Sequence, residues 1–92
     1  MYNRFSEMRR RYLREHRNGI YTGMLLDDKL DAHLKEIGES ALVMFDRLVE
    51  QMKKAEGVTE QLKAENQMEW IGRMNSIRSR AEETVLNDLI YN

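Results

Sequence analysis

The sequence predicts an all-α fold, an antiparallel three-helix bundle with one short extra helix. Three observations support this prediction. The 92 residues contain no proline and no cysteine, and apolar residues recur at spacings of three and four over most of the chain, which is the period of a helix face. Apolar residues make up 41% and charged residues 34%, a composition typical of folded helical proteins. A chain of this length supports one core, so we expect a single domain over residues 1–92.

The first helix is expected over about residues 3–17. Phe5, Met8 and Tyr12 share one face of this segment, which predicts an apolar stripe against the core. Arg9 falls beside that stripe, so its stem must lie along the stripe or its guanidinium must meet a carboxylate. The remaining arginines fan over the opposite face: Arg4, Arg10, Arg11, Arg14 and Arg17.

An elbow with the short extra helix is expected between the first helix and the hairpin. The Asn-Gly pair at 18–19 tolerates positive φ and is predicted to end the first helix. Thr22 is predicted to cap one or two helical turns. Asp28 is predicted to be the N-cap of the next helix, where negative charge meets the positive end of the helix dipole.

A long helical hairpin is expected over about residues 29–55 and 60–88. Gly57 is predicted to end the first arm and Thr59 to cap the second, so the connection is short and the two arms run antiparallel. The first arm carries a regular apolar stripe: Leu30, Leu34, Ile37, Ala41, Met44, Phe45, Leu48 and Met52.

The second arm is expected to be one unbroken helix with two apolar ridges, and therefore with two neighbours. One ridge consists of Leu62, Trp70, Met74, Ile77, Ala81, Val85 and Leu89. The other consists of Ala64, Met68, Ile71 and Leu86, and is interrupted by Asn75 and Ser79. The first arm would cover one ridge, and the arginine-faced helix together with the elbow from Ile20 to Leu26 would cover the other. We expect eight residues to be buried: Leu34, Ile37, Phe45, Leu48, Leu62, Trp70, Ile77 and Ala81.

Residues 56–80 resemble the transposon-encoded protein family TnpV. The resemblance is carried by the opening Thr-Glu-Gln-Leu-Lys at 59–63, by Trp70 and by the Met-Asn pair at 74–75, and it extends to Tyr-Leu-Arg-Glu-His-Arg at 12–17. It implies a protein of a bacterial mobile element and no particular biochemical activity. The pattern differs in two places, because relatives usually have an additional N-terminal stretch that this chain lacks and commonly have glycine where Asp28 stands.

The charge distribution makes nucleic acid a candidate partner. Residues 1–17 contain six arginines and two glutamates, a net charge of +4, whereas the other 75 residues carry −5. A helix that presents several arginines on one side can neutralise phosphates along a nucleic-acid backbone. The alternatives are a solvated face and a face paired with the acidic part of the same chain. The resemblance favours DNA or a transposition protein as the partner.

Catalysis is not expected. The two histidines, His16 and His33, lie on different expected helices, and neither follows a glutamate at the Glu-x-x-His spacing of helical metal centres. We therefore expect no enzyme activity, cofactor, metal or small-molecule substrate. No run approaches the roughly 20 apolar residues that cross a bilayer, so we expect a cytoplasmic protein without membrane association.

The second hypothesis is a protein-interaction or self-association module without nucleic-acid contact. Its candidate interface is Met68, Ile71, Asn75 and Ser79. Either the polar pair hydrogen-bonds to a neighbouring helix and sets register, or this ridge is partly exposed and binds a partner. A homodimer would enlarge a core that is small for one copy. The first hypothesis is the one that the charge distribution supports. It describes a non-catalytic accessory or regulatory protein of a transposon that contacts nucleic acid through its N-terminal helix.

Overall fold

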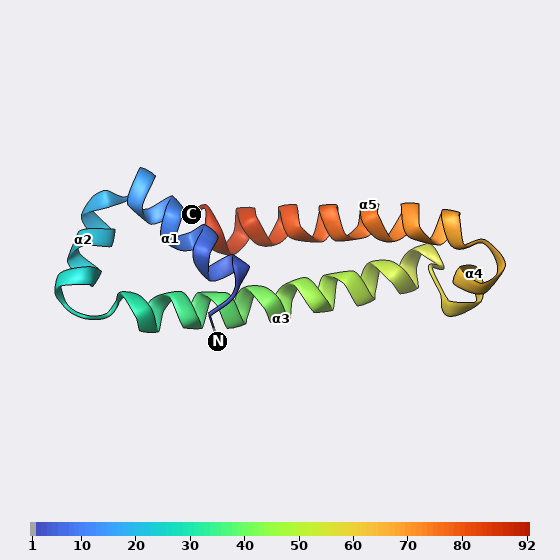
Figure 1. The fold of residues 1–92 in the computed structure, drawn as a ribbon, viewed down its shortest axis with the longest axis horizontal. Coiled ribbons are helices and arrows are strands. Elements are labelled where there is room, and N and C mark those ends of the chain that lie inside the picture. Colours follow the sequence, from blue (N-terminus) through green and yellow to red (C-terminus); the bar gives the residue numbers. More distant parts are fainter. Residues whose placement is uncertain (1) are drawn as a thin grey trace.

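The computed structural model describes residues 2–92 as a helical bundle of 55 × 21 × 18 Å. The elements are α1 (Arg4–His16), α2 (Asn18–Leu26), α3 (Leu30–Glu56), α4 (Glu60–Glu65), α5 (Gln67–Val85) and the π-helical turn η1 (Leu86–Ile90). α3 and α5 are the long arms of an antiparallel hairpin; α1 and α2 lie at one end and α4 at the other (Figure 1). No strand occurs within residues 2–92. The predicted all-α bundle is confirmed.

α1 is fixed to α3 by hydrogen bonds at its N-terminus. The Asn3 side chain accepts hydrogen bonds from the backbone N–H groups of Phe5 and Ser6, and Ser6 Oγ accepts one from the Asn3 N–H, which completes a capping box. The same two side chains also reach α3, because Asn3 Nδ2 donates to the Gly38 carbonyl at 2.9 Å and Ser6 Oγ donates to the Leu34 carbonyl at 2.8 Å. The cap of α1 is therefore also its attachment to the hairpin.

The elbow differs from the prediction in where its helix begins. α1 ends at His16 because Arg17, with φ −135° and ψ 52°, leaves the helical region. The Asn-Gly pair at 18–19 does not end α1 but opens α2, and Thr22 lies inside α2 and does not cap it. A single residue outside helical geometry thus separates two helices, and the short extra helix is longer than the one or two turns expected.

Asp28 is not the N-cap of α3. Its φ of 58° is in the left-handed region, where glycine carries no steric penalty, and the N-cap position belongs to Lys29, without a side-chain hydrogen bond. At the other end of α3 the prediction is confirmed, because Gly57 with φ 67° forms a left-handed C-cap and the Thr59 hydroxyl caps α4.

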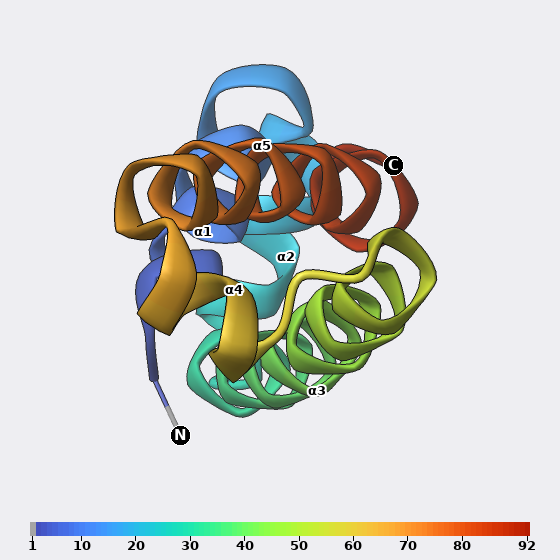
Figure 2. The ribbon, with the colours of Figure 1, turned by 90° about the vertical axis from the view of Figure 1, so that its right-hand side faces the viewer.

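The second arm was predicted to be one helix over residues 60–88, but the structure divides it. Asn66, with φ −148° and ψ 83°, interrupts it, and Asn66 Oδ1 accepts the Glu69 N–H at 3.2 Å to cap α5. An asparagine side chain that bonds to nearby backbone competes with helix continuation. α4 consequently turns away from the axis of α5 (Figure 2), and the long second arm consists of α5 and η1.

The core lies between the two arms in two clusters. One cluster combines buried residues of α3, α5 and the connection before α4: Val49, Val58, Met74, Ile77 and Ala81. The other lies where α1 joins the hairpin: Phe5, Ala41, Val85 and Ile90. Of the eight residues predicted to be buried, Leu34, Ile77 and Ala81 are buried and the other five are partly buried. The central helix is α3, which contacts α1, α2, α5 and η1. Within residues 2–92 no helix is both long enough and apolar enough to cross a bilayer.

Candidate functional site

The arginines of α1 fall into two groups. Arg4 and Arg9 contact other elements of the bundle, whereas the other three arginines of α1, and Arg17 directly after it, have exposed or partly exposed side chains. The members of this outward group are Arg10, Arg11, Arg14 and Arg17; the first is partly exposed and the other three are exposed. We call these four residues the basic face.

Arg4 connects α1 to both arms of the hairpin. Its Nε lies 3.4 Å from Glu82 Oε1 on α5, and its guanidinium carbon lies 4.4 Å from the Phe5 ring centroid and 4.9 Å from that of Phe45 on α3. A guanidinium over aromatic faces is attracted by the ring quadrupole. Arg4 is thus engaged within the fold, and we do not count it in the basic face.

Arg9 donates hydrogen bonds to backbone oxygens and to His33; of the two alternatives open from the sequence, a side-chain carboxylate within residues 2–92 is not its partner. Its Nη1 donates to the Ile90 carbonyl at 2.8 Å and to the Asn92 carbonyl at 3.2 Å, and its Nε donates to His33 Nε2 at 3.3 Å. Burial lowers the pKa of Arg9, and burial together with the Arg9 charge lowers the pKa of His33. Arg9 therefore holds the C-terminal end of η1 against α1 and α3, with His33 neutral beside it.

Glu7 forms an ion pair within the basic face. Glu7 Oε1 is 3.5 Å from Arg10 Nη1, and the pKa of Glu7 is lowered first by the Tyr2 hydroxyl hydrogen bond and then by neighbouring arginines. The hydroxyl of Tyr21 and the Glu7 charge raise the pKa of Arg10. Within residues 2–92 the guanidinium groups of Arg11, Arg14 and Arg17 form no ion pair within 4 Å. Three cations of the basic face are thus available to an external anion.

The predicted interface on the second ridge is solvent-exposed. Met68 is 80% and Ile71 40% exposed, and Asn75 and Ser79 are exposed as well. Within residues 2–92 neither polar side chain hydrogen-bonds to a neighbouring helix. α1 approaches this side of α5 only near Glu82, the partner of Arg4. The expectation that the N-terminal helix and the elbow from Ile20 to Leu26 cover the second ridge is therefore wrong, because α1 has only 13 residues and α2 contacts α1 and α3 but not α5.

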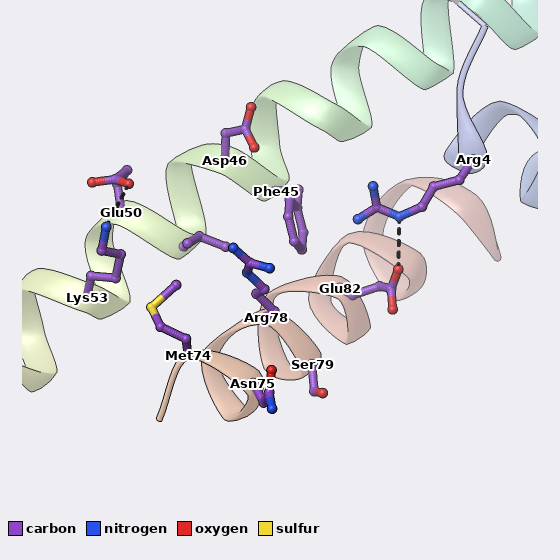
Figure 3. Close-up of a pocket in the computed structure, with 11 residues that line it drawn as sticks. Arg4, Phe45, Asp46, Glu50, Lys53, Met74, Asn75, Arg78, Ser79 and Glu82 are labelled. Carbon is purple, nitrogen blue, oxygen red and sulfur yellow. Dashed lines mark hydrogen bonds and ion pairs between the residues drawn. The ribbon is translucent and has the colours of Figure 1, made fainter. Parts of the chain in front are cut away.

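The uncovered side of the hairpin contains an open groove of about 690 Å³ between α3 and α5. Phe45 and Val49 of α3 and Met74 of α5 contribute apolar surface to it, and Asn75 and Ser79 line the α5 side (Figure 3). Acidic and basic side chains alternate around it: Arg4, Asp46, Glu50, Lys53, Arg78 and Glu82. The groove combines apolar contacts with charges of both signs, which suits a protein segment better than a uniformly charged polymer.

α2 is an exposed helix, although the sequence predicted that its apolar residues pack against the second ridge. Its nine residues are apolar or uncharged, yet none is buried. Ile20 is 54%, Leu25 55% and Leu26 80% exposed. The available signal was the lack of an amphipathic pattern, since apolar residues spread around the whole helix cannot all face one core.

Comparison with known proteins gives a family and nothing more specific. The model of the family described as transposon-encoded protein TnpV matches residues 1–90. No curated protein and no solved structure matches the chain. The family match spans both the basic face and the second ridge.

Proposed function

We propose, from the premise that the chain belongs to the TnpV family of transposon-encoded proteins, that it is a non-catalytic accessory protein of a mobile element that contacts nucleic-acid phosphates through α1. The proposal rests on one observation. Phe5 and Leu13 are fully buried, so α1 is held in a fixed orientation that presents the basic face outward. The proposal places the protein in the cytoplasm with the DNA of the element.

The spacing of the basic face suits a phosphate backbone. From Arg10 to Arg14 the helix rises about 6 Å at 1.5 Å per residue, Arg17 follows just after its last turn, and duplex DNA carries one negative charge per roughly 1.7 Å of its axis. Several phosphates therefore lie within reach of these side chains. Glu7 and the exposed Glu15 offset part of the positive charge, so we expect weak, sequence-independent and strongly salt-dependent binding.

Fluorescence anisotropy with a labelled duplex tests this proposal. Neutralising three or four phosphates gives a slope of about −3 in a plot of log affinity against log salt concentration. The double variant R11E/R14E should abolish binding at low salt. The matched control K35E/R47E makes the same change of charge at exposed positions of α3 and should weaken binding much less. Absence of binding at low salt, or equal losses in the two variants, would refute the proposal.

The second candidate function is self-association through the second ridge. Exposure of Met68 and Ile71 on the arm that lines the open groove favours it, because large apolar side chains that remain exposed together often mark interfaces. Sedimentation velocity of the unmodified chain and of the variant M68K/I71K distinguishes a dimer formed through this ridge from a monomer and from a dimer formed through another surface. A monomer at every concentration of the unmodified chain, or a dimer that the variant leaves intact, would exclude this candidate.

A further inference from the structure

α2 is an apolar helix without a packing partner for most of its surface. Its sequence, NGIYTGMLL, has no charged residue, and no residue of it is buried. A helix that is apolar all round is normally buried on most sides. Ile20, Leu25 and Leu26 are each more than half exposed, although all three are large apolar residues.

One side of α2 faces away from the bundle. Tyr21 and Met24 are the only partly buried residues of the helix, and helical spacing puts Gly23 and Leu26 on the opposite side. No atom lies within 4 Å of a Cβ built at Gly19 or Gly23. α2 runs across one end of the molecule (Figure 1), so this outward side is accessible to another macromolecule.

The charges at the two ends of α2 have opposite signs. Arg17 immediately precedes the helix, and Asp27 and Asp28 immediately follow it. Within residues 2–92 none of these three side chains takes part in an ion pair within 4 Å. Two copies of α2 packed antiparallel, with a two-fold axis at Thr22, place Arg17 of each copy beside Asp27 of the other. The two ends of α2 are thus complementary in charge.

We propose that α2 is a docking surface for a second copy of this chain, which binds it through its own α2 in antiparallel orientation. The exposed side chain of Leu26, on the same side of the helix as Gly19 and Gly23, then loses contact with water, and an Arg17–Asp27 pair lies at each end of the contact. A parallel arrangement would put the two Arg17 side chains together. An anionic membrane would attract Arg17 but repel Asp27 and Asp28, so the acidic end of α2 favours a protein partner.

The dimer is independent of the proposed nucleic-acid contact, because its residues and its assay need no nucleic acid. Arg17 alone belongs to both surfaces. In the dimer its guanidinium meets Asp27 of the second copy, which leaves Arg10, Arg11 and Arg14 for phosphate. A nine-residue helix buries less than the roughly 1,200 Å² of a standard interface, so we expect a weak dimer that forms in the upper micromolar range.

Sedimentation velocity of the full chain over a concentration series tests the hydrophobic part of the proposal. The variant L26K replaces the most exposed apolar residue of α2 and should weaken dimerisation about tenfold, equivalent to one unit of log Kd. The control V43K introduces the same side chain at a 57% exposed position on α3 and should leave the dimer unchanged. Circular dichroism should show the same helicity for both. A chain that is monomeric at all concentrations, or equal effects of the two variants, would overturn the proposal.

Charge exchange tests the antiparallel geometry. R17D and D27R should each weaken the homodimer, because each puts like charges together across the two-fold axis. The double variant R17D/D27R should restore it, and a mixture of R17D with D27R should form a heterodimer more readily than either forms a homodimer. Failure of both rescues would overturn the geometry. Binding of the monomer to phosphatidylglycerol vesicles without self-association in solution would overturn the choice of partner.

Discussion

α1 and α2 follow one another with only Arg17 between them, yet the bundle uses them in opposite ways. α1 carries many charges and buries Phe5 and Leu13 completely, whereas α2 has no charge and buries nothing. The difference lies in the arrangement of apolar residues and not in their number. α1 has one apolar stripe and one polar face, so packing on one side is enough to bury its apolar residues. α2 has apolar residues on all sides, so one neighbour leaves some of them exposed.

Truncation of the α1 stripe should have the largest effect on stability. Phe5→Ala removes a fully buried ring that contacts Phe45, and such substitutions cost about 3–5 kcal/mol. This loss is a large part of the stability expected for a domain of this size, so urea denaturation followed by circular dichroism should show a variant that is mostly unfolded or close to it. A cost below about 1 kcal/mol would mean that α1 is not an integral part of the core.

Removal of the α1 cap should have a moderate effect. Asn3→Ala removes two N-cap hydrogen bonds and the bond to the Gly38 carbonyl, so we expect a loss of about 1–2 kcal/mol in the free energy of unfolding. Asn18→Ala is the matched change at the start of α2, where the side chain makes only a 3.4 Å bond to the Arg14 carbonyl. Equal losses in the two variants would contradict the difference in attachment between the helices.

Acidification should loosen the attachment of α1 through His33. The folded state lowers the pKa of His33 below 6.5, so between that lowered value and 6.5 the unfolded chain binds more protons than the folded chain. Stability therefore rises with pH in this window and falls as pH decreases below about 6.5. Protonation also removes the Nε2 acceptor of the Arg9 hydrogen bond and puts two cations together.

The variant His33→Gln isolates this effect. It removes the titrating group but keeps a side chain that can accept a hydrogen bond, so its thermal midpoint should change less between pH 7 and pH 5.5 than that of the unmodified chain. The acidic groups with lowered pKa values, Glu7 and Glu56, titrate below this window and do not interfere. A pH dependence that is the same in both proteins would contradict a contribution of His33.

Changes on α2 should have the smallest effect on the fold of a single copy. Leu26→Ser removes a side chain that is 80% exposed, and substitutions at such positions stay within about 0.5 kcal/mol. Urea denaturation at dilute concentration, where the proposed dimer dissociates, measures this directly. A loss above about 2 kcal/mol would show that α2 packs against the bundle more closely than its exposure indicates.

Features with a local cause could be predicted from the sequence. The regular stripe of α3 predicted its length and its buried face, and Gly57 and Thr59 predicted the reversal because caps depend on neighbouring residues. The break at Asn66 also had a local signal, an asparagine three residues before Glu69, but the apolar ridges suggested continuity through it. Features with a distant cause could not be predicted. Arg9 bonds to the carbonyl of Ile90, 81 residues away, and no spacing within the first helix indicates that contact.

The candidate site was predictable to the same degree. The helical period placed Arg10, Arg11 and Arg14 on one side of α1, and that arrangement follows from the helix alone, whereas Arg17 lies just outside the helix. The period also grouped Arg4 with them, but its packing against Phe45 and Glu82 depends on how α1 docks on the hairpin. The exposure of α2 was hidden because apolar composition normally indicates burial.

The central claim is that the charged side of α1, and not the second ridge, is the surface that nucleic acid contacts. Backbone amide chemical shifts recorded by NMR during titration with a short duplex at low salt test it most directly. The account predicts that the largest shifts occur between Arg10 and Arg17 and diminish as salt is added. Shifts centred on Met68, Ile71, Asn75 and Ser79, or no shifts at low salt, would contradict it.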